Sequence, residues 1–283
     1  MSKRILFMGT PDYATTIFSE LLQSNYEIIG LFTQPDKPVG RKQILTAPHI
    51  KQYCLDLNLN IPIFQPLKLR GNEEATKQIT ELKPDFIIVA AYGQILPKEI
   101  LDIAPCINLH ASLLPKYRGA SPIQESLLND DIYTGVTSML MEEGLDSGDI
   151  LGLQYLRITS TMEVSEAFEK LSLIAAKLTI TTLDNFENIK PIKQNESQVS
   201  FCKKIKKEDG LIDFIDAKKL YLKYKAYSYW PGIFLESELK LKDIELNDEK
   251  SINNQGQILE INSDFIIVGC EKGSLKIKTL QAP

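Results

Sequence analysis

The chain has 283 residues, 43% of them hydrophobic, which excludes a disordered chain and allows one large domain or two modest ones. A formal net charge of −5 argues against a partner that is bound through overall positive charge, such as nucleic acid. The apolar run at residues 5–8 is too short for a signal-peptide core or a membrane span, so we expect a cytoplasmic protein with no membrane partner.

The start of the chain predicts a strand, a helix and a second strand. Residues 4–8 are an apolar strand, and residues 9–11 then supply a turn, a candidate helix N-cap and a proline for the first helical position. Apolar side chains recur at helical spacing over residues 14–22, and residues 26–32 are the next strand. This βαβ unit lacks the full glycine fingerprint of a dinucleotide site and does not by itself indicate a nucleotide cofactor.

The next segment alternates loops with regular elements. Residues 34–42 contain two prolines and a glycine with hardly any apolar side chains, which predicts a long exposed loop. Residues 47–57 are an amphipathic helix with His49 exposed on its first turn. Residues 86–91 are a continuous apolar strand of the kind buried on both faces of a parallel sheet, and residues 92–97 turn out of it.

Residues 106–110 predict the end of a buried strand that carries two polar side chains. Asn108 and His110 alternate onto the face opposite the apolar residues, two positions apart. His110 is one of only two histidines, so few other side chains could accept a proton near neutral pH. A lone histidine is more often a hydrogen-bonded residue of the core than part of a site. The strand alone leaves open whether His110 is a core residue or a proton acceptor.

Two irregular segments could approach this strand end. Residues 112–119 carry Pro115 and Gly119, which prevent a helix, and loops directly after buried strands are where α/β proteins bind ligands. Residues 142–149 crowd four carboxylates and two glycines, and Asp146 could fold back to orient the imidazole. A solvated turn explains the acidic loop equally well.

A long amphipathic helix begins near residue 161, and after it the sequence pattern changes to polar stretches and short strand-like pieces. A polar stretch at residues 189–199 reads as a linker, and a lysine cluster and a lysine-bearing helix follow it. Five short strand-like pieces then suit a small antiparallel barrel, at residues 211–215, 239–246, 257–261, 265–268 and 274–280. We expect Trp230 to pack in the core or at a hinge between domains rather than to stack on a base. The four cysteines show no paired metal-ligand spacing, so neither zinc nor a disulfide is expected.

Six blocks together resemble one family. Asn108, His110 and Asp146, with Ser112-Leu-Leu-Pro-Lys-Tyr-Arg-Gly119 between them, are similar to the signature of the formyltransferases that use 10-formyltetrahydrofolate. The other matches follow in the family's order at residues 7–12, 32–41, 64–66, 89–97 and 230–232. One block would be weak evidence, but six in register cover nearly the whole chain. Within the family the chain is most similar to members that act on tRNA.

The resemblance implies the fold and the activity. The fold would be α/β, an open, mostly parallel Rossmann-like sheet with a C-terminal small OB-like β-barrel. Residues 1–188 would form the catalytic domain with the folate site, residues 189–204 a linker, and residues 205–283 the tRNA-binding domain. The enzyme would transfer a formyl group from 10-formyltetrahydrofolate to the free amino group of methionine on initiator tRNA, for translation initiation. We expect it to act as a monomer and without a metal.

The same resemblance implies the site residues. Asn108 would donate a hydrogen bond to the developing oxyanion, and His110 and Asp146 would handle the proton of the amine. Folate would contact two turns, made of Tyr92, Gly93, Gln94, Ile95 and Leu96, and of Ser112, Leu113, Leu114 and Pro115. The tRNA would contact Arg41, Lys42, Lys203, Lys204, Lys206 and Lys207. Lys42 is followed by Gln43 and Ile44, a less basic sequence than the family's pattern at this loop.

Other functions fit part of the pattern. A formyltransferase acting on an amino sugar nucleotide or another small amine, or a hydrolase of formylfolate, would share the asparagine, histidine and aspartate. The opening at residues 9–12, the loop at residues 34–36 and the lysine-bearing second domain favour tRNA. A folate- or RNA-binding module without turnover would not require all three polar residues.

Overall fold

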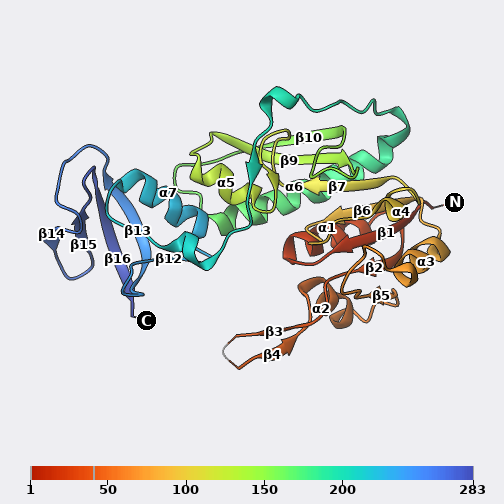
Figure 1. Cartoon of the computed structure of the whole chain (residues 1–283), viewed down its shortest axis with the longest axis horizontal. Helices are drawn as coiled ribbons and strands as arrows, with labels where there is room; N and C mark the ends of the chain where they lie inside the picture. The colour runs from red at the N-terminus through yellow and green to blue at the C-terminus, as the bar shows by residue number, and fades with distance from the viewer. Residues whose placement is uncertain (1, 41, 283) are drawn as a thin grey trace. The chain divides into compact units, whose positions relative to one another are not determined.

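The computed structural model describes residues 2–40 and 42–282, and these residues form two compact units (Figure 1). The first unit comprises residues 1–118, 135–156 and 169–200, and the second comprises residues 119–134, 157–168 and 201–283. The helices are α1 (Asp12–Leu22), α2 (His49–Asp56), α3 (Glu73–Leu82), α4 (Lys98–Leu101), α5 (Pro122–Leu128), α6 (Val164–Asn185) and α7 (Ala217–Tyr227).

A seven-stranded sheet with the order β10-β9-β7-β6-β1-β2-β5 organises the first unit. The pairs β1–β2, β1–β6, β2–β5 and β6–β7 are parallel, and β7 pairs with β9 in the antiparallel sense. The strands are β1 (Arg4–Gly9), β2 (Glu27–Phe32), β5 (Ile63–Phe64), β6 (Phe86–Ala90), β7 (Cys106–His110), β9 (Tyr133–Leu140) and β10 (Ile150–Arg157). This arrangement confirms the predicted α/β class with a mostly parallel sheet.

The centre of the sheet is apolar on both faces, as the continuous apolar runs predicted. Residues 5–8 of β1 are completely buried, and all five residues of β6 are buried beside them. The chain runs from β1 to β2 and β5 on one side, and continues through β6 and β7 on the other. The carboxyl ends of β1 and β6 therefore flank the switch point at which open α/β sheets bind ligands.

The predicted loop at residues 34–42 is partly wrong, because a β-hairpin occupies this region. Strands β3 (Lys37–Val39) and β4 (Ile44–Thr46) pair in the antiparallel sense. Gly40 and Gln43 have positive φ angles of 72° and 48°, which turn the chain. The apolar side chains of both strands stay exposed, with Leu45 68% exposed. This hairpin is formed by backbone pairing without a buried face, so the sequence has no pattern of buried residues that would predict it.

A polar cluster fixes the base of the hairpin to the first unit. Lys51 Nζ donates to both carboxylate oxygens of Asp36 at 2.9 Å and to Gln65 Oε1 at 2.8 Å. Gln65 Nε2 donates to Asp36 Oδ1 and to the carbonyl of Gln34, each at 2.8 Å. The hydrogen bond from Gln65, followed by that from Lys51, lowers the pKa of Asp36 below its ordinary value.

The second unit contains a five-stranded sheet with the order β12-β13-β16-β15-β14, paired in the antiparallel sense. Its strands are β12 (Ile233–Phe234), β13 (Lys240–Asp248), β14 (Ile258–Ile261), β15 (Ile266–Gly269) and β16 (Ser274–Gln281). Four of the five predicted strands are confirmed. Residues 211–215 form no strand, because Asp213 accepts from the amide of Ile215 and Asp216 caps α7 at the amide of Lys219.

Several side chains of the second unit depart from simple expectations. Lys225 on the lysine-bearing helix is only 2% exposed, and its ammonium donates to the carbonyl of Ser160 at 3.1 Å, with its pKa lowered by burial. Trp230 is 50% exposed and Tyr229 is 84% exposed, so neither packs in the core.

Within the described parts of the chain, no helix is both long and apolar enough to cross a membrane.

Candidate active site

Three polar side chains meet at the carboxyl end of β7. Asn108 pairs with Val89 of β6 and Met139 of β9, so it is held between two strands. Asp146 comes from the loop between β9 and β10 and has a positive φ of 47°. Asn108 Nδ2 donates to Asp146 Oδ1 at 3.3 Å, and Asp146 Oδ2 lies 3.6 Å from Nδ1 of His110. The predicted approach of Asp146 to the strand end is therefore present.

The hydrogen bonds of His110 fix its tautomer. Nε2 lies 2.9 Å from the carbonyl oxygen of Tyr117, and a carbonyl can only accept, so Nε2 carries a hydrogen. Nδ1 is then the basic nitrogen of the neutral ring, and it faces the Asp146 carboxylate. His110 is only 6% exposed, and Asp146 is partly exposed.

The thiol of Cys106 lies on the same strand but is not a candidate nucleophile. Its side chain is 3% exposed, and burial raises the pKa of the thiol to about 12. A thiol that stays protonated near neutral pH is a poor nucleophile. Among the described residues, no three His, Cys, Asp or Glu side chains are grouped as ligands for a metal ion.

The segment after β7 is held by its own polar groups. The Ser112 hydroxyl is fully buried and donates to the carbonyl of Lys116 at 2.6 Å. Thr137 on β9 donates to the carbonyl of Ser112 at 2.6 Å and accepts from the amide of Leu114 at 3.0 Å. Leu114 is buried, while Leu113 and Pro115 are half-buried. The Ser112 side chain therefore maintains the turn rather than pointing outward.

The turn after β6 combines buried anchors with exposed residues. The Tyr92 carbonyl accepts from Thr10 Oγ1 and from Gln34 Nε2, each at 3.1 Å, which joins the ends of β1, β2 and β6. Gln94 accepts from the amide of Leu69 at 2.9 Å and donates to the carbonyl of Pro66 at 3.0 Å. Tyr92 and Leu96 are buried, Gln94 is half-buried, and Gly93 and Ile95 are exposed.

The residues predicted to contact tRNA fall in both units. Arg41 lies outside the described residues, and Lys42 is exposed at the turn of the β3–β4 hairpin. Lys203, Lys204, Lys206 and Lys207 are all exposed in the second unit, where Lys203 is paired with Asp209 and Lys207 with Glu238.

Sequence reasoning missed the side chains that hold the candidate site together. Thr137, Thr10 and Gln34 fix turns through side-chain hydrogen bonds to backbone groups. Gln194 donates to the carbonyls of Asp146 and Gly148, although it lies within the segment that reads as a linker. The neighbouring residues do not indicate that Gln194 is buried, because a single buried glutamine in a polar stretch produces no periodic pattern.

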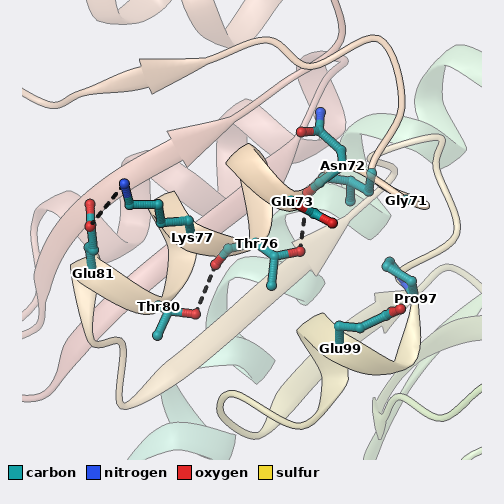
Figure 2. A pocket seen from close by; sticks show the side chains of 10 residues that line it. Gly71, Asn72, Glu73, Thr76, Lys77, Thr80, Glu81, Pro97 and Glu99 are labelled. Atoms are coloured by element: carbon teal, nitrogen blue, oxygen red, sulfur yellow. Dashed lines mark hydrogen bonds and ion pairs between the residues drawn. The ribbon is translucent and has the colours of Figure 1, made fainter.

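A hollow of about 500 Å³ lies elsewhere in the first unit, against α3 and the start of α4 (Figure 2). None of the predicted site residues lines it. Its threonines donate to carbonyls of α3 itself, Thr76 to Asn72 and Thr80 to Thr76, and Lys77 lies 3.9 Å from Glu81. Since these polar groups are already paired within the helix, the hollow offers few groups to a ligand.

Comparison with known proteins agrees with the fold. Residues 3–183 match the family described as Formyl transferase, and residues 204–283 match Formyl transferase, C-terminal domain. The chain therefore belongs to the formyl transferase family. It is 58% identical over 280 residues to the methionyl-tRNA formyltransferase of a Nitratiruptor species, an alignment that covers 99% of this chain and 92% of that relative. This similarity places the chain in the methionyl-tRNA formyltransferase branch of the family.

Two solved structures are similar in fold. The N-formyltransferase of Helicobacter canadensis in complex with folinic acid and dTDP-3-aminofucose has a TM-score of 0.73 at 16% identity, covering 99% of this chain and 100% of that one. HypX of Aquifex aeolicus in complex with tetrahydrofolic acid has a TM-score of 0.69 at 17% identity, and this chain spans 44% of its length. At these identities, the likeness concerns the fold alone.

Proposed function

We propose that this chain transfers the formyl group of 10-formyltetrahydrofolate to the α-amino group of methionine esterified to initiator tRNA, for translation initiation. The observation that carries the proposal is the meeting of Asn108, His110 and Asp146 at one strand end, in a chain 58% identical to a methionyl-tRNA formyltransferase. The enzyme would act in the cytoplasm as a monomer and without a metal.

The reaction requires a proton acceptor beside the attacking amine. The neutral amine forms a bond to the formyl carbon, the amine nitrogen then loses a proton, and the bond from that carbon to the folate nitrogen breaks as this nitrogen gains a proton. His110 Nδ1 and the Asp146 carboxylate, 3.6 Å apart, can hold one proton between them. They would take it from the amine and return it to the departing nitrogen.

The reaction also requires a donor for the formyl oxygen, which becomes an oxyanion in the tetrahedral intermediate. Asn108 uses one N–H of its amide to reach Asp146 Oδ1, and this bond orients the side chain. The second N–H would donate to the oxyanion. In other enzymes the loss of one such donor slows turnover by about 100- to 1000-fold.

The two turns at the strand ends would hold the folate. Gly93 and Ile95 are exposed on the turn after β6, and Leu113 and Pro115 are half-buried after β7. These residues offer backbone groups and apolar walls, the mixture that a ring ligand requires. Tyr92, Gln94, Leu96, Ser112 and Leu114 would support the pocket from behind, through the buried contacts and hydrogen bonds described above.

The tRNA would contact both units. Lys42, which follows Arg41 in the sequence, is exposed at the turn of the β3–β4 hairpin, and the exposed lysines at positions 203, 204, 206 and 207 offer phosphate contacts in the second unit. We assign residues 1–188 to catalysis, residues 189–204 to a linker and residues 205–283 to a small OB-like barrel that binds tRNA. The antiparallel sheet of the second unit supports this assignment.

The deciding experiment measures formyl transfer from 10-formyltetrahydrofolate to methionine-charged initiator tRNA at two salt concentrations. Charged elongator tRNA, free methionine and a nucleotide-linked amino sugar serve as competing acceptors. Transfer confined to the initiator tRNA and weakened by salt would support the proposal. Transfer to the amino sugar, or consumption of the folate without any acceptor, would replace it by a small-amine transferase or a hydrolase. Folate binding without any turnover would indicate a binding module.

A further inference from the structure

Residues 192–200, called the bracing segment here, contact both polar loops of the candidate active site from far along the chain. The segment begins on the sheet, where Ile192 and Ile150 exchange backbone hydrogen bonds of 2.8 and 2.9 Å at the start of β10. It ends at Ser200, the last residue of the first unit. Its contacts with the candidate site therefore all lie within that unit.

Gln194, which is only 8% exposed, makes the first contact. Its Nε2 donates to the carbonyl oxygens of Asp146 and Gly148, each at 2.8 Å. Its Oε1 accepts from Nε of Arg118 at 3.0 Å. Arg118 is 5% exposed, and its guanidinium also donates to Glu196 of the same segment at 2.8 Å. One buried amide therefore joins the loop of Asp146 to the loop that follows β7.

The second contact is made by Ser200, at the other end of the segment. Its hydroxyl accepts from the amide of Tyr117 at 2.9 Å, and its carbonyl accepts from the amide of Arg118 at 2.9 Å. The carbonyl of Tyr117 accepts from Nε2 of His110, so this contact supports the residue that fixes the tautomer of the imidazole.

We propose that Gln194 is a positioning residue for formyl transfer. Its Nε2 donates to the carbonyls of Asp146 and Gly148, which fixes the backbone of this loop and directs the Asp146 carboxylate toward Asn108 and His110. Asp146 has a positive φ of 47°, a conformation that is uncommon for a residue with a side chain and persists where the surroundings enforce it. The two bonds from Gln194 enforce it from behind, without touching either substrate. The activity readout of this proposal rests on the proposed function.

The test compares Gln194→Met with the matched change Gln198→Met, which alters an exposed glutamine four residues later. Displacement of a catalytic group by about 1 Å can cost roughly 100-fold in rate, so Gln194→Met should lower kcat by about 10- to 100-fold. The KM values for folate and tRNA should stay within about twofold. Gln198→Met should match the wild type. Amide hydrogen exchange over residues 142–149 should accelerate in Gln194→Met alone.

A second variant separates positioning from general support. Gln194→Glu keeps an acceptor for Arg118 but removes both donors, and it sets a carboxylate oxygen against two carbonyls. We expect its kcat to fall as far as that of Gln194→Met, whereas full recovery would assign the role to Arg118 and overturn the proposal. If Gln194→Met does not fold, Gln194→Asn replaces it, because the shorter amide keeps the site polar but cannot reach both carbonyls.

The two proposals fail in different ways. A wild-type protein that forms no formylmethionyl-tRNA would reject the proposed function, while the exchange of residues 142–149 would still report on Gln194. An active wild type with unchanged kcat and unchanged exchange in Gln194→Met would reject the positioning role alone.

Discussion

Replacing the Asp146 carboxylate by an amide should abolish most activity while leaving the fold intact. In Asp146→Asn the side chain keeps its size, its oxygen can still accept from Asn108, and the introduced N–H can donate to the basic Nδ1 of His110. Asn108 and His110 both keep a polar partner, so we expect the free energy of unfolding to change by less than about 1 kcal/mol.

The catalytic loss follows from the charge. At an effective dielectric constant of about 20, unit charges separated by the 3.6 Å between Asp146 and His110 attract each other by roughly 4.6 kcal/mol. In the proposed reaction that attraction would stabilise the proton taken from the amine, and an amide cannot supply it. Loss of a general base slows reactions by about 100- to 10,000-fold, equivalent to about 3–5 kcal/mol in the barrier. We therefore expect kcat to fall within this range.

Single-turnover transfer of formyl groups to charged initiator tRNA, together with thermal unfolding, measures both effects. Glu143→Gln is the matched control, since it removes the same charge from an exposed position of the same loop. A rate for Asp146→Asn within threefold of the wild type would refute the assignment. A large loss of stability would refute the view that Asn108 and His110 accept an amide equally well.

Three further predictions test the surroundings of the site. The lowered pKa of Asp36 means that its bonds with Gln65 and Lys51 stabilise the protein above the ordinary value of 3.8 and lose this effect as the pH falls below it. Asp36→Asn should therefore speed the amide hydrogen exchange of residues 37–46 at neutral pH. It should also remove the part of their protection from exchange that the wild type loses in acid, so an unchanged pH profile of protection would contradict this prediction. Gly148→Ala should lower both kcat and the melting temperature, because the new Cβ would collide with the backbone carbonyl of Leu140, whereas Gly144→Ala meets mainly the movable Ser147 hydroxyl and should be mild. Replacing Lys204 and Lys206 by alanine should raise the KM for tRNA and reduce the slope of log affinity against log salt by about 0.7–0.9 for each phosphate that is no longer neutralised, and an unchanged slope would remove them from the interface.

The strand framework was predictable because burial imposes a period on the sequence. The apolar run at residues 86–91 predicted a strand buried on both faces, residues 4–8 predicted the first strand of a βαβ unit, and the alternation at residues 106–110 placed Asn108 and His110 on one face. Helix α7 and strands β13 to β16 followed from similar patterns.

The remaining features depend on hydrogen bonds that leave no period in the sequence. The β3–β4 hairpin has no buried face, residues 211–215 divert their backbone into an Asx turn and a helix cap, and Lys225 is buried through one bond to Ser160. The position of Asp146 was predicted only as one of two equal alternatives. Its contacts with Gln194 span 48 residues, and no local rule connects a polar linker to a catalytic loop.

The proposed role of Gln194 would extend the residues that serve catalysis beyond position 188. A boundary drawn at residue 188 follows the end of the sheet and of α6, but Gln194 and Ser200 lie beyond it and hold the loops of Asp146 and His110. The exposed lysines begin at Lys203, three residues after the last of these contacts. Because any displacement of residues 192–200 must strain the bonds to Asp146, Tyr117 and Arg118, we expect such a displacement to disturb the loop at residues 142–149 and the segment after β7 more than it disturbs the turn after β6.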